Sequence, residues 1–205
     1  RMLNKRLSVI LVMDDMLLDV HDGVVGPSVM RGVANTLAQP IWKFGWKSNK
    51  GVDRYAFWNS DFVGNVKSNK IPTDDMLKGF ERDWPAMNML WMNLFHSVLK
   101  PKYNIGGFYR FYSNGYTHGN GGSIHTDDGH ITVLYYSNIE WELWNHGGTN
   151  FYYEDGSDLM KTVAYKPGRF AVFDAKLPHC GLEPSKTAYA LRTMVVFKCY
   201  YGDGK

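Results

Sequence analysis

Two histidines and one aspartate are the residues of this chain whose types and spacing could do chemistry. His125 and Asp127 form a His-x-Asp motif, and His179 follows later in the chain, in the phrase Pro178-His179-Cys180. Two imidazoles and one carboxylate can occupy one face of a metal ion and leave other positions open for substrates. That ligand set is typical of non-haem Fe(II) oxygenases. A zinc hydrolase with three protein ligands and a bound water stays open on these residues alone.

The surroundings of the three residues favour one common site. Residues two apart on a strand point to the same side, so a strand end could present His125 and Asp127 to one ion. His179 follows the strand-like run 170–174, and no His-Glu-x-x-His motif or Cys-x-x-Cys pair competes as a ligand set. Four other histidines lie in turns or in a helical segment, where we expect surface or structural positions: His96, His118, His130 and His146.

The composition indicates one globular domain. The chain has 205 residues, of which 44% are hydrophobic and 15% aromatic, enough for a sizeable core. A net charge of +3 gives no electrostatic argument for a nucleic acid or a membrane as partner. Two cysteines are too few for a disulfide framework, so the cytoplasm is the expected compartment. The apolar run 8–13 is too short to cross a bilayer and is interpreted as a strand, not a signal peptide.

The first part of the chain is predicted to contain a helix, a strand and a loop. Residues 28–39 have helical character, with Ser28 as the expected N-cap and Pro40 as the stop. The aromatic run 41–46 is predicted to be a strand. The polar segment 51–70 is predicted to be a loop.

The clearest helix is predicted between Pro85 and Lys100. Proline fits the first turn of a helix, and Pro101 is expected to end this one. Seven apolar residues recur at helical spacing and form one stripe: Met87, Leu90, Trp91, Leu94, Phe95, Val98 and Leu99.

The second half of the chain is predicted to be rich in strands. Short β-branched and aromatic runs alternate with turn residues at 105–113, 122–127, 131–137, 149–153, 161–165, 169–174, 177–181 and 188–200. The predicted fold class is therefore mostly β (α+β): a double-stranded β-helix, or jelly roll, with N-terminal helices packed on one sheet. We expect a single domain over residues 1–205, in which 1–104 supports a catalytic core at 105–200.

The segment 105–200 resembles the 2-oxoglutarate/Fe(II)-dependent dioxygenases, in particular their prolyl-hydroxylase-like branch. The resemblance covers just under half of the chain, and it rests on several motifs in a shared order. These are His125-Thr-Asp127, the strand 132–138 with Tyr-Tyr-Ser-Asn at its end, Gly147-Gly148-Thr149-Asn150-Phe151, the strand 166–173, His179 and Arg192. There are two departures: the gap between His179 and Arg192 is longer than usual, and His146 replaces a glycine.

The resemblance implies a cofactor and an activity. His125, Asp127 and His179 would hold Fe(II) and leave three positions open for 2-oxoglutarate, a bidentate ligand, and O2. The activity would be hydroxylation of an unactivated C–H bond with release of succinate and CO2, and ascorbate would support it. Halogenases have a small residue in place of Asp127, so this aspartate favours hydroxylation.

The resemblance also implies a cosubstrate pocket. Arg192 would bind the far carboxylate of 2-oxoglutarate through its planar guanidinium. It stands in an apolar run, where a buried arginine needs an anionic partner. Tyr136 would add a hydroxyl to the same carboxylate, and Tyr112 would face the pocket. Packing in the core is the alternative for each tyrosine, and a surface ion pair is the alternative for Arg192.

The sequence leaves the substrate open. The branch favours a prolyl or other peptide side chain, whereas a small molecule or a nucleobase is the alternative; weak basicity disfavours nucleic acid. Three aromatic residues near the expected mouth could stack on a ring of the substrate: Tyr116, Trp141 and Trp144. A position in the core or in a surface loop is an equal alternative for each. A rival from another class is a jelly-roll binding module without catalysis. Such a module has no use for a carboxylate clamp at Arg192 and Tyr136.

Overall fold

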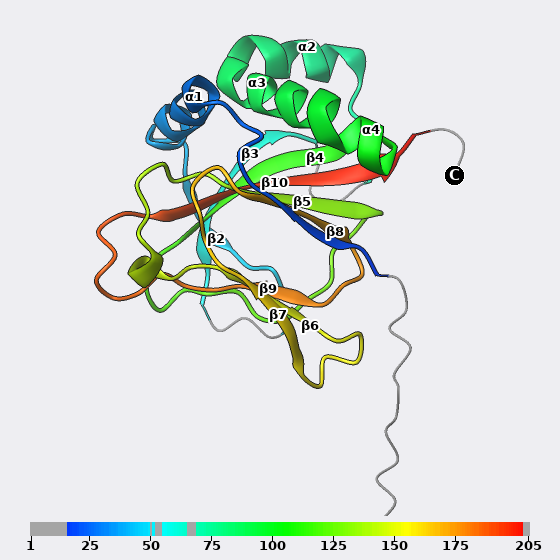
Figure 1. The fold of residues 1–205 in the computed structure, drawn as a ribbon. Helices are drawn as coiled ribbons and strands as arrows, with labels where there is room; N and C mark the ends of the chain where they lie inside the picture. The colour runs from blue at the N-terminus through cyan, green and yellow to red at the C-terminus, as the bar shows by residue number, and fades with distance from the viewer. Residues whose placement is uncertain (1–15, 50, 52–54, 65–68, 203–205) are drawn as a thin grey trace, which may run out of the picture.

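The computed structural model describes residues 16–49, 51, 55–64 and 69–202, and these form two β-sheets that face each other (Figure 1). Its strands are β1 (Leu18–His21), β2 (Lys43–Trp46), β3 (Phe57–Val63), β4 (Ile105–Tyr116), β5 (Ile131–Tyr136), β6 (Thr149–Tyr152), β7 (Leu159–Val163), β8 (Phe170–Asp174), β9 (His179–Gly181) and β10 (Arg192–Tyr201). Its helices are α1 (Pro27–Leu37), α2 (Asp74–Asp83), α3 (Pro85–Leu94) and α4 (Lys100–Tyr103), with a π-helical turn at Phe95–Leu99 and a 3-10 turn at Leu143–Asn145. The predicted mostly-β, two-sheet architecture is confirmed.

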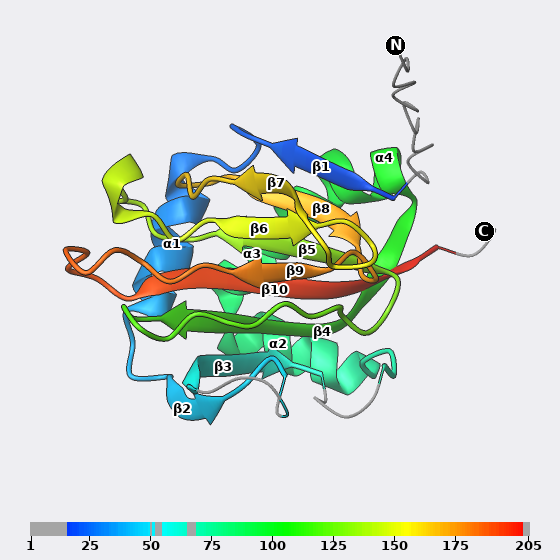
Figure 2. The ribbon, with the colours of Figure 1, turned by 90° about the horizontal axis from the view of Figure 1, so that it is seen from below.

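The two sheets differ in size, and their neighbouring strands pair antiparallel. The larger sheet has seven strands in the order β1-β8-β5-β10-β4-β3-β2. The smaller one has three strands in the order β7-β6-β9, and it lies across the inner face of the larger sheet (Figure 2). The helices cover the opposite face (Figure 1). In the described part of the chain, no helix has the length and the apolar character that a membrane crossing needs.

The central strand β10 separates the core from the site. It pairs with β4 on one side and β5 on the other. Because side chains alternate along a strand, Val195, Phe197 and Cys199 point into the apolar cluster under the helices. The alternate residues point between the sheets and line a cavity there: Arg192, Met194, Val196 and Lys198.

The helix layer is held by the apolar stripe that the sequence indicates. Met87, Leu90 and Leu94 on α3 are fully buried, and they share one cluster with Val33 of α1 and Phe197 of β10. Full burial of each such side chain contributes roughly 1.5–3 kcal/mol. The expectation that this helix covers the outer face of one sheet is therefore confirmed.

Two helix boundaries differ from the prediction. Helix α1 begins at Pro27, after an extended Gly26, and no side chain caps it, so Ser28 is not its N-cap. The helix that starts at Pro85 does not end at Pro101. A π-helical turn shifts the hydrogen-bond register, and Pro101 then falls in the first turn of α4, where a missing N–H costs little.

The prediction of a loop over 51–70 is wrong, because this segment contains β3. Asn59 and Ser60 are polar yet buried. The Asn59 amide donates to the Ser113 carbonyl oxygen (3.1 Å) and to the side chain of Asn114 (3.2 Å), both on β4. Tertiary pairing thus overrides the local polar composition. The strand predicted at 8–13 lies outside the described residues.

A small ion cluster fixes β1 at the edge of the larger sheet. The Asp19 carboxylate accepts hydrogen bonds from Lys102 Nζ (2.5 Å) and from the Tyr103 hydroxyl (2.7 Å). The bond from Lys102, and then the bond from Tyr103, lower the pKa of Asp19 to about 2.

Asp19→Asn is expected to lower the free energy of unfolding at pH 7 by about 1 kcal/mol, the upper value for an exposed ion pair. A depressed carboxylate pKa stabilises the fold above the unfolded-state pKa, and this contribution is lost as the pH falls from about 4 to about 2. Urea unfolding at stepped pH should therefore show the two proteins converging at low pH. Asp83→Asn is the control, because the Arg82–Asp83 pair is exposed. A difference that persists at pH 2, or an equal loss in the control, would contradict this.

Candidate metal centre and cosubstrate pocket

His125, Asp127 and His179 lie together between the two sheets. His125 and His179 form an isolated antiparallel bridge, in which each backbone N–H donates to the other residue's carbonyl (3.0 and 2.9 Å). The Asp127 N–H donates to the Ala175 carbonyl (2.7 Å). The predicted strand at 122–127 is therefore wrong: this segment is an extended loop held by a few bonds to the chain around β9. The bridge, not a sheet strand, brings the motif to His179.

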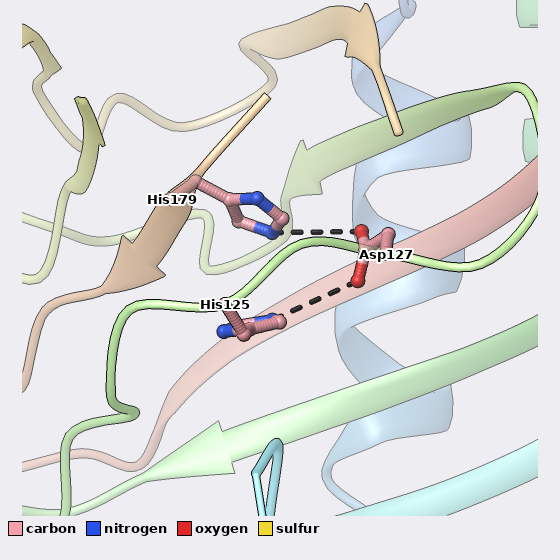
Figure 3. Close-up of side chains that lie close together, drawn as sticks. All are labelled: His125, Asp127 and His179. Atoms are coloured by element: carbon pink, nitrogen blue, oxygen red, sulfur yellow. Dashed lines mark ion pairs between the residues drawn. The ribbon is translucent and has the colours of Figure 1, made fainter. Parts of the chain in front are cut away.

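Both imidazoles present the same nitrogen to Asp127. His125 Nδ1 lies 2.8 Å from the Ser123 carbonyl oxygen, and His179 Nδ1 lies 3.0 Å from that of Leu177. A carbonyl only accepts, so each Nδ1 carries the proton and each Nε2 has a free lone pair. The Nε2 atoms lie 3.7 and 3.5 Å from the two carboxylate oxygens of Asp127 (Figure 3). These separations exceed hydrogen-bond length.

The three ligand atoms fit a metal ion. They lie within 4.8 Å of one another, while ligands at about 2.1 Å in adjacent octahedral positions are roughly 3 Å apart. Phe151 and Phe173 pack against the His179 ring, which is buried. Burial is the main cause that lowers the pKa of His179 to about 4, so this imidazole is neutral at neutral pH and free to bind a metal.

Asp127 is ionised although its side chain is only 9% exposed. Burial alone would raise its pKa, but the charges of Lys198, His179 and His125 bring the pKa below its usual range. Its Oδ2 accepts a hydrogen bond from the Thr132 hydroxyl (2.7 Å) and pairs with Lys198 Nζ. Lys198 was not anticipated from the sequence. The signal was available, because Lys198 lies an even number of residues after Arg192 on the same strand.

Arg192 lies in the wall of the cavity that contains the triad. This cavity has a volume of about 160 Å³. The Arg192 side chain is 1% exposed, and it donates from Nε to the Gly147 carbonyl (2.6 Å) and from Nη2 to the Gly148 carbonyl (3.1 Å). Among the described residues, no carboxylate lies within ion-pair distance of it. A buried guanidinium without an anionic partner fits a site for a ligand carboxylate.

The turn before β6 is built around Arg192. Gly147 has φ +82°, and a Cβ there would lie 3.0 Å from Arg192 Cγ. His146, which stands where the resembling family often has glycine, also has a positive φ of 56°. The carbonyl of His146 accepts from Trp141 Nε1 (2.9 Å), so three successive carbonyls of this turn are used by Trp141 and Arg192. The departure at His146 thus leaves the turn able to hold the arginine.

The two tyrosines assigned to the pocket differ in position. Tyr112 lines the cavity and is also part of the core. Tyr136 is buried beside the cavity, and its hydroxyl donates to Thr149 Oγ1 (3.0 Å), a residue that does line it. The role of Tyr136 toward a carboxylate stays a prediction.

The three aromatic residues expected at the mouth also differ in position. Tyr116 lines the cavity, and the guanidinium of Arg192 lies 4.8 Å from its ring centre. Trp141 is a core residue that packs on Tyr165, whereas Trp144 is exposed on the surface. Four histidines expected outside the site are exposed: His96, His118, His130 and His146.

Sequence reasoning missed a second feature of the cavity wall. The Arg110 guanidinium lies 4.0 Å from the ring centre of Tyr112 and 4.9 Å from that of Trp46. It also donates to Asp61 (2.8 Å). Trp46 and Arg110 both line the cavity. No local motif marks this contact, because the residues come from three different strands.

Comparison with known proteins places the fold. No family model matches the sequence, and no curated protein matches it. Among solved structures, a prolyl hydroxylase from Trichoplax adhaerens, in complex with a peptide of the hypoxia inducible factor oxygen degradation domain, is similar (18% identity, TM-score 0.55, 89% of this chain and 82% of that one). So is a Pseudomonas putida prolyl-4-hydroxylase (13%, 0.56, 90% and 94%). A 2OG-Fe(II) oxygenase family oxidoreductase from Burkholderia pseudomallei also matches (12%, 0.61, 88% and 83%). The chain has the jelly-roll fold of these oxygenases, and the resemblance noted in the sequence is confirmed at the level of the fold.

Removal of one candidate ligand tests the metal centre. We expect Asp127→Ala to abolish binding of one Mn²⁺ ion per chain in calorimetric titrations, because only neutral ligands would remain. Asp75→Ala is the control, since this carboxylate is exposed on α2 and does not line the cavity, and it should bind Mn²⁺ like the unaltered protein. Equal Mn²⁺ affinity in both variants would remove Asp127 from the site.

Proposed function

We propose that this protein is a non-haem Fe(II)/2-oxoglutarate-dependent dioxygenase that hydroxylates an unactivated C–H bond. His125, Asp127 and His179 would hold the iron, and Arg192 would bind the far carboxylate of 2-oxoglutarate. The observation that carries the proposal is the buried guanidinium of Arg192 in the same cavity as the triad. A zinc hydrolase or a structural metal site offers no reason for a buried cation without a carboxylate partner.

Bound iron and 2-oxoglutarate would supply the oxidising chemistry, in which O2 is consumed, 2-oxoglutarate gives succinate and CO2, and one oxygen atom enters a C–H bond. The protein's own residues set the conditions for this chemistry. The carbonyls of Ser123 and Leu177 orient the two imidazoles. The rings of Phe151 and Phe173 keep water from the buried side of His179.

The opposite part of the cavity would orient the dicarboxylate. The carbonyls of Gly147 and Gly148 hold Arg192 at Nε and Nη2, and neither of these bonds uses Nη1. We infer that Tyr136 acts through Thr149, whose hydroxyl accepts the tyrosine's hydrogen bond and faces the cavity. The Tyr112 ring would form the cavity wall between the metal ligands and Arg192.

For the substrate we propose a peptide or protein side chain, with proline the first candidate. Two of the similar structures are described as prolyl hydroxylases, and one of those holds a peptide. The aromatic side chain of Trp46 in the cavity wall, stacked on Arg110, offers a flat face for such a ring.

Turnover of 2-oxoglutarate tests the proposed reaction. With Fe(II), ascorbate and 2-oxoglutarate, the protein should form succinate slowly even without its substrate. Arg192→Ala should raise the 2-oxoglutarate concentration at half-maximal rate by about tenfold or more, the effect of losing one charged hydrogen-bonded pair, and leave the iron requirement nearly unchanged. Lys186→Ala, an exposed cation, is the control.

The result that contradicts the proposal is absence of both succinate formation and 2-oxoglutarate binding, which would favour a non-catalytic jelly-roll module. Mass spectrometry of candidate peptides, read for a product heavier by one oxygen atom, then identifies the substrate.

A further inference from the structure

Lys198 is a buried cation in contact with the carboxylate of the candidate metal centre. Its side chain is 8% exposed, and on β10 it stands between the fully buried Phe197 and Cys199. Its Nζ pairs with Asp127 Oδ2 and lies 3.4 Å from Thr132 Oγ1. A buried lysine needs an anionic partner, and this partner is also a candidate metal ligand.

The contacts of Asp127 distinguish its two oxygens. Oδ2 receives the Thr132 hydroxyl (2.7 Å) and the Lys198 ammonium, and two donors use both of its lone pairs. Oδ1 lies 3.7 Å from His125 Nε2 and takes part in neither contact, whereas Oδ2 lies 3.5 Å from His179 Nε2 with both lone pairs in use. The geometry therefore leaves Oδ1 for a metal ion and favours coordination through one oxygen.

The same contacts set the charge that a metal ion meets. The two imidazoles are neutral when they bind metal, and the charges of Asp127 and Lys198 cancel. Arg110, which lies opposite Lys198 in the pairing of β4 and β10, is paired with Asp61, so this ion pair adds no net negative charge. Asp128 and Arg192 also line the cavity, and their opposite charges add no net charge. A divalent ion would thus enter a site without net charge and keep both of its own charges uncompensated until an anionic ligand binds.

We propose, on the basis of the proposed function, that Lys198 is a positioning residue that holds Asp127 for one-oxygen coordination and makes metal binding depend on a bound carboxylate. The metal binds weakly alone and much more tightly with 2-oxoglutarate. Because such coupling is reciprocal, the dicarboxylate also binds tightly only when the metal is present.

The test is Mn²⁺ affinity, measured from free Mn²⁺ by electron paramagnetic resonance, with and without saturating 2-oxoglutarate. In the unaltered protein, 2-oxoglutarate should lower the Mn²⁺ Kd by about tenfold or more. Lys198→Met should bind Mn²⁺ alone about tenfold more tightly, because Asp127 then presents its full charge, and the effect of 2-oxoglutarate should shrink to a few-fold. Lys198→Gln keeps a hydrogen-bond donor without the charge, and it should behave like Lys198→Met.

Two controls separate charge from structure. Lys198→Arg keeps the charge and should retain most of the coupling. Lys176→Met removes an exposed lysine that donates to the backbone carbonyl of Asp127 (3.1 Å), and it should match the unaltered protein. Thermal unfolding with added Mn²⁺ gives a second readout, in which the metal should raise the Tm more in Lys198→Gln than in the unaltered protein.

Unchanged or weaker Mn²⁺ binding in folded Lys198→Gln, with the 2-oxoglutarate effect retained, overturns the inference. If 2-oxoglutarate affects none of the proteins, the proposed function fails. The comparison of Mn²⁺ binding alone still decides whether the charge of Lys198 weakens the metal site.

Discussion

The burial of two cations on one face of β10 is the constraint on which the rest of this structure depends. A charge buried between two sheets persists only where nearby groups compensate the loss of water. The carbonyls of Gly147 and Gly148 replace part of the hydration of Arg192 but leave its charge unpaired, whereas the carboxylate of Asp127 pairs with Lys198. The first contact ties the turn before β6, a strand of the smaller sheet, to the central strand of the larger one. The second ties the loop between β4 and β5, which is bridged to β9 of the smaller sheet, to the same strand. The polar contacts that build the cavity thus also hold the two layers in register.

The other face of β10 stabilises the fold against the cost of burying these two cations. Val195, Phe197 and Cys199 pack under the helices in one continuous apolar cluster. That burial contributes several kcal/mol and opposes the cost of desolvating the charged groups on the cavity side. Successive residues of β10 therefore point alternately into the apolar core and into the charged cavity. A shift of register by one residue would exchange them, burying the charges in the core and opening the cavity.

The parts of the fold that follow from local sequence were predictable, and those that depend on distant partners were not. The stripe around Leu90 and the apolar runs of the second half gave the correct helix layer and most strands. Strand β3 is not predicted, because asparagine is typical of loops. Asn59 is buried in a strand only because its amide donates to Ser113 and Asn114 on β4. The sequence predicts a helix stop at Pro101, because a π-helical turn has no sequence signature comparable to a cap. At the site, the three candidate ligands were recognised and lie together, whereas the strand expected to present two of them is a loop.

Lys198 is a second charged residue in the apolar run of β10. Arg192 was singled out because an arginine in an apolar run must have an anionic partner, and the same reasoning applies to a lysine before Cys199. Its partner is Asp127, which is also a candidate metal ligand. The Asp127 carboxylate can bind both the Lys198 ammonium and a metal ion if each contacts a different oxygen. The contacts of Oδ2 leave Oδ1 for the metal. Lys198 and the metal ion would then share the single negative charge of Asp127. On the proposed role of Lys198, an additional anion would belong to the stable metal-bound site, a property that no single residue of the triad explains.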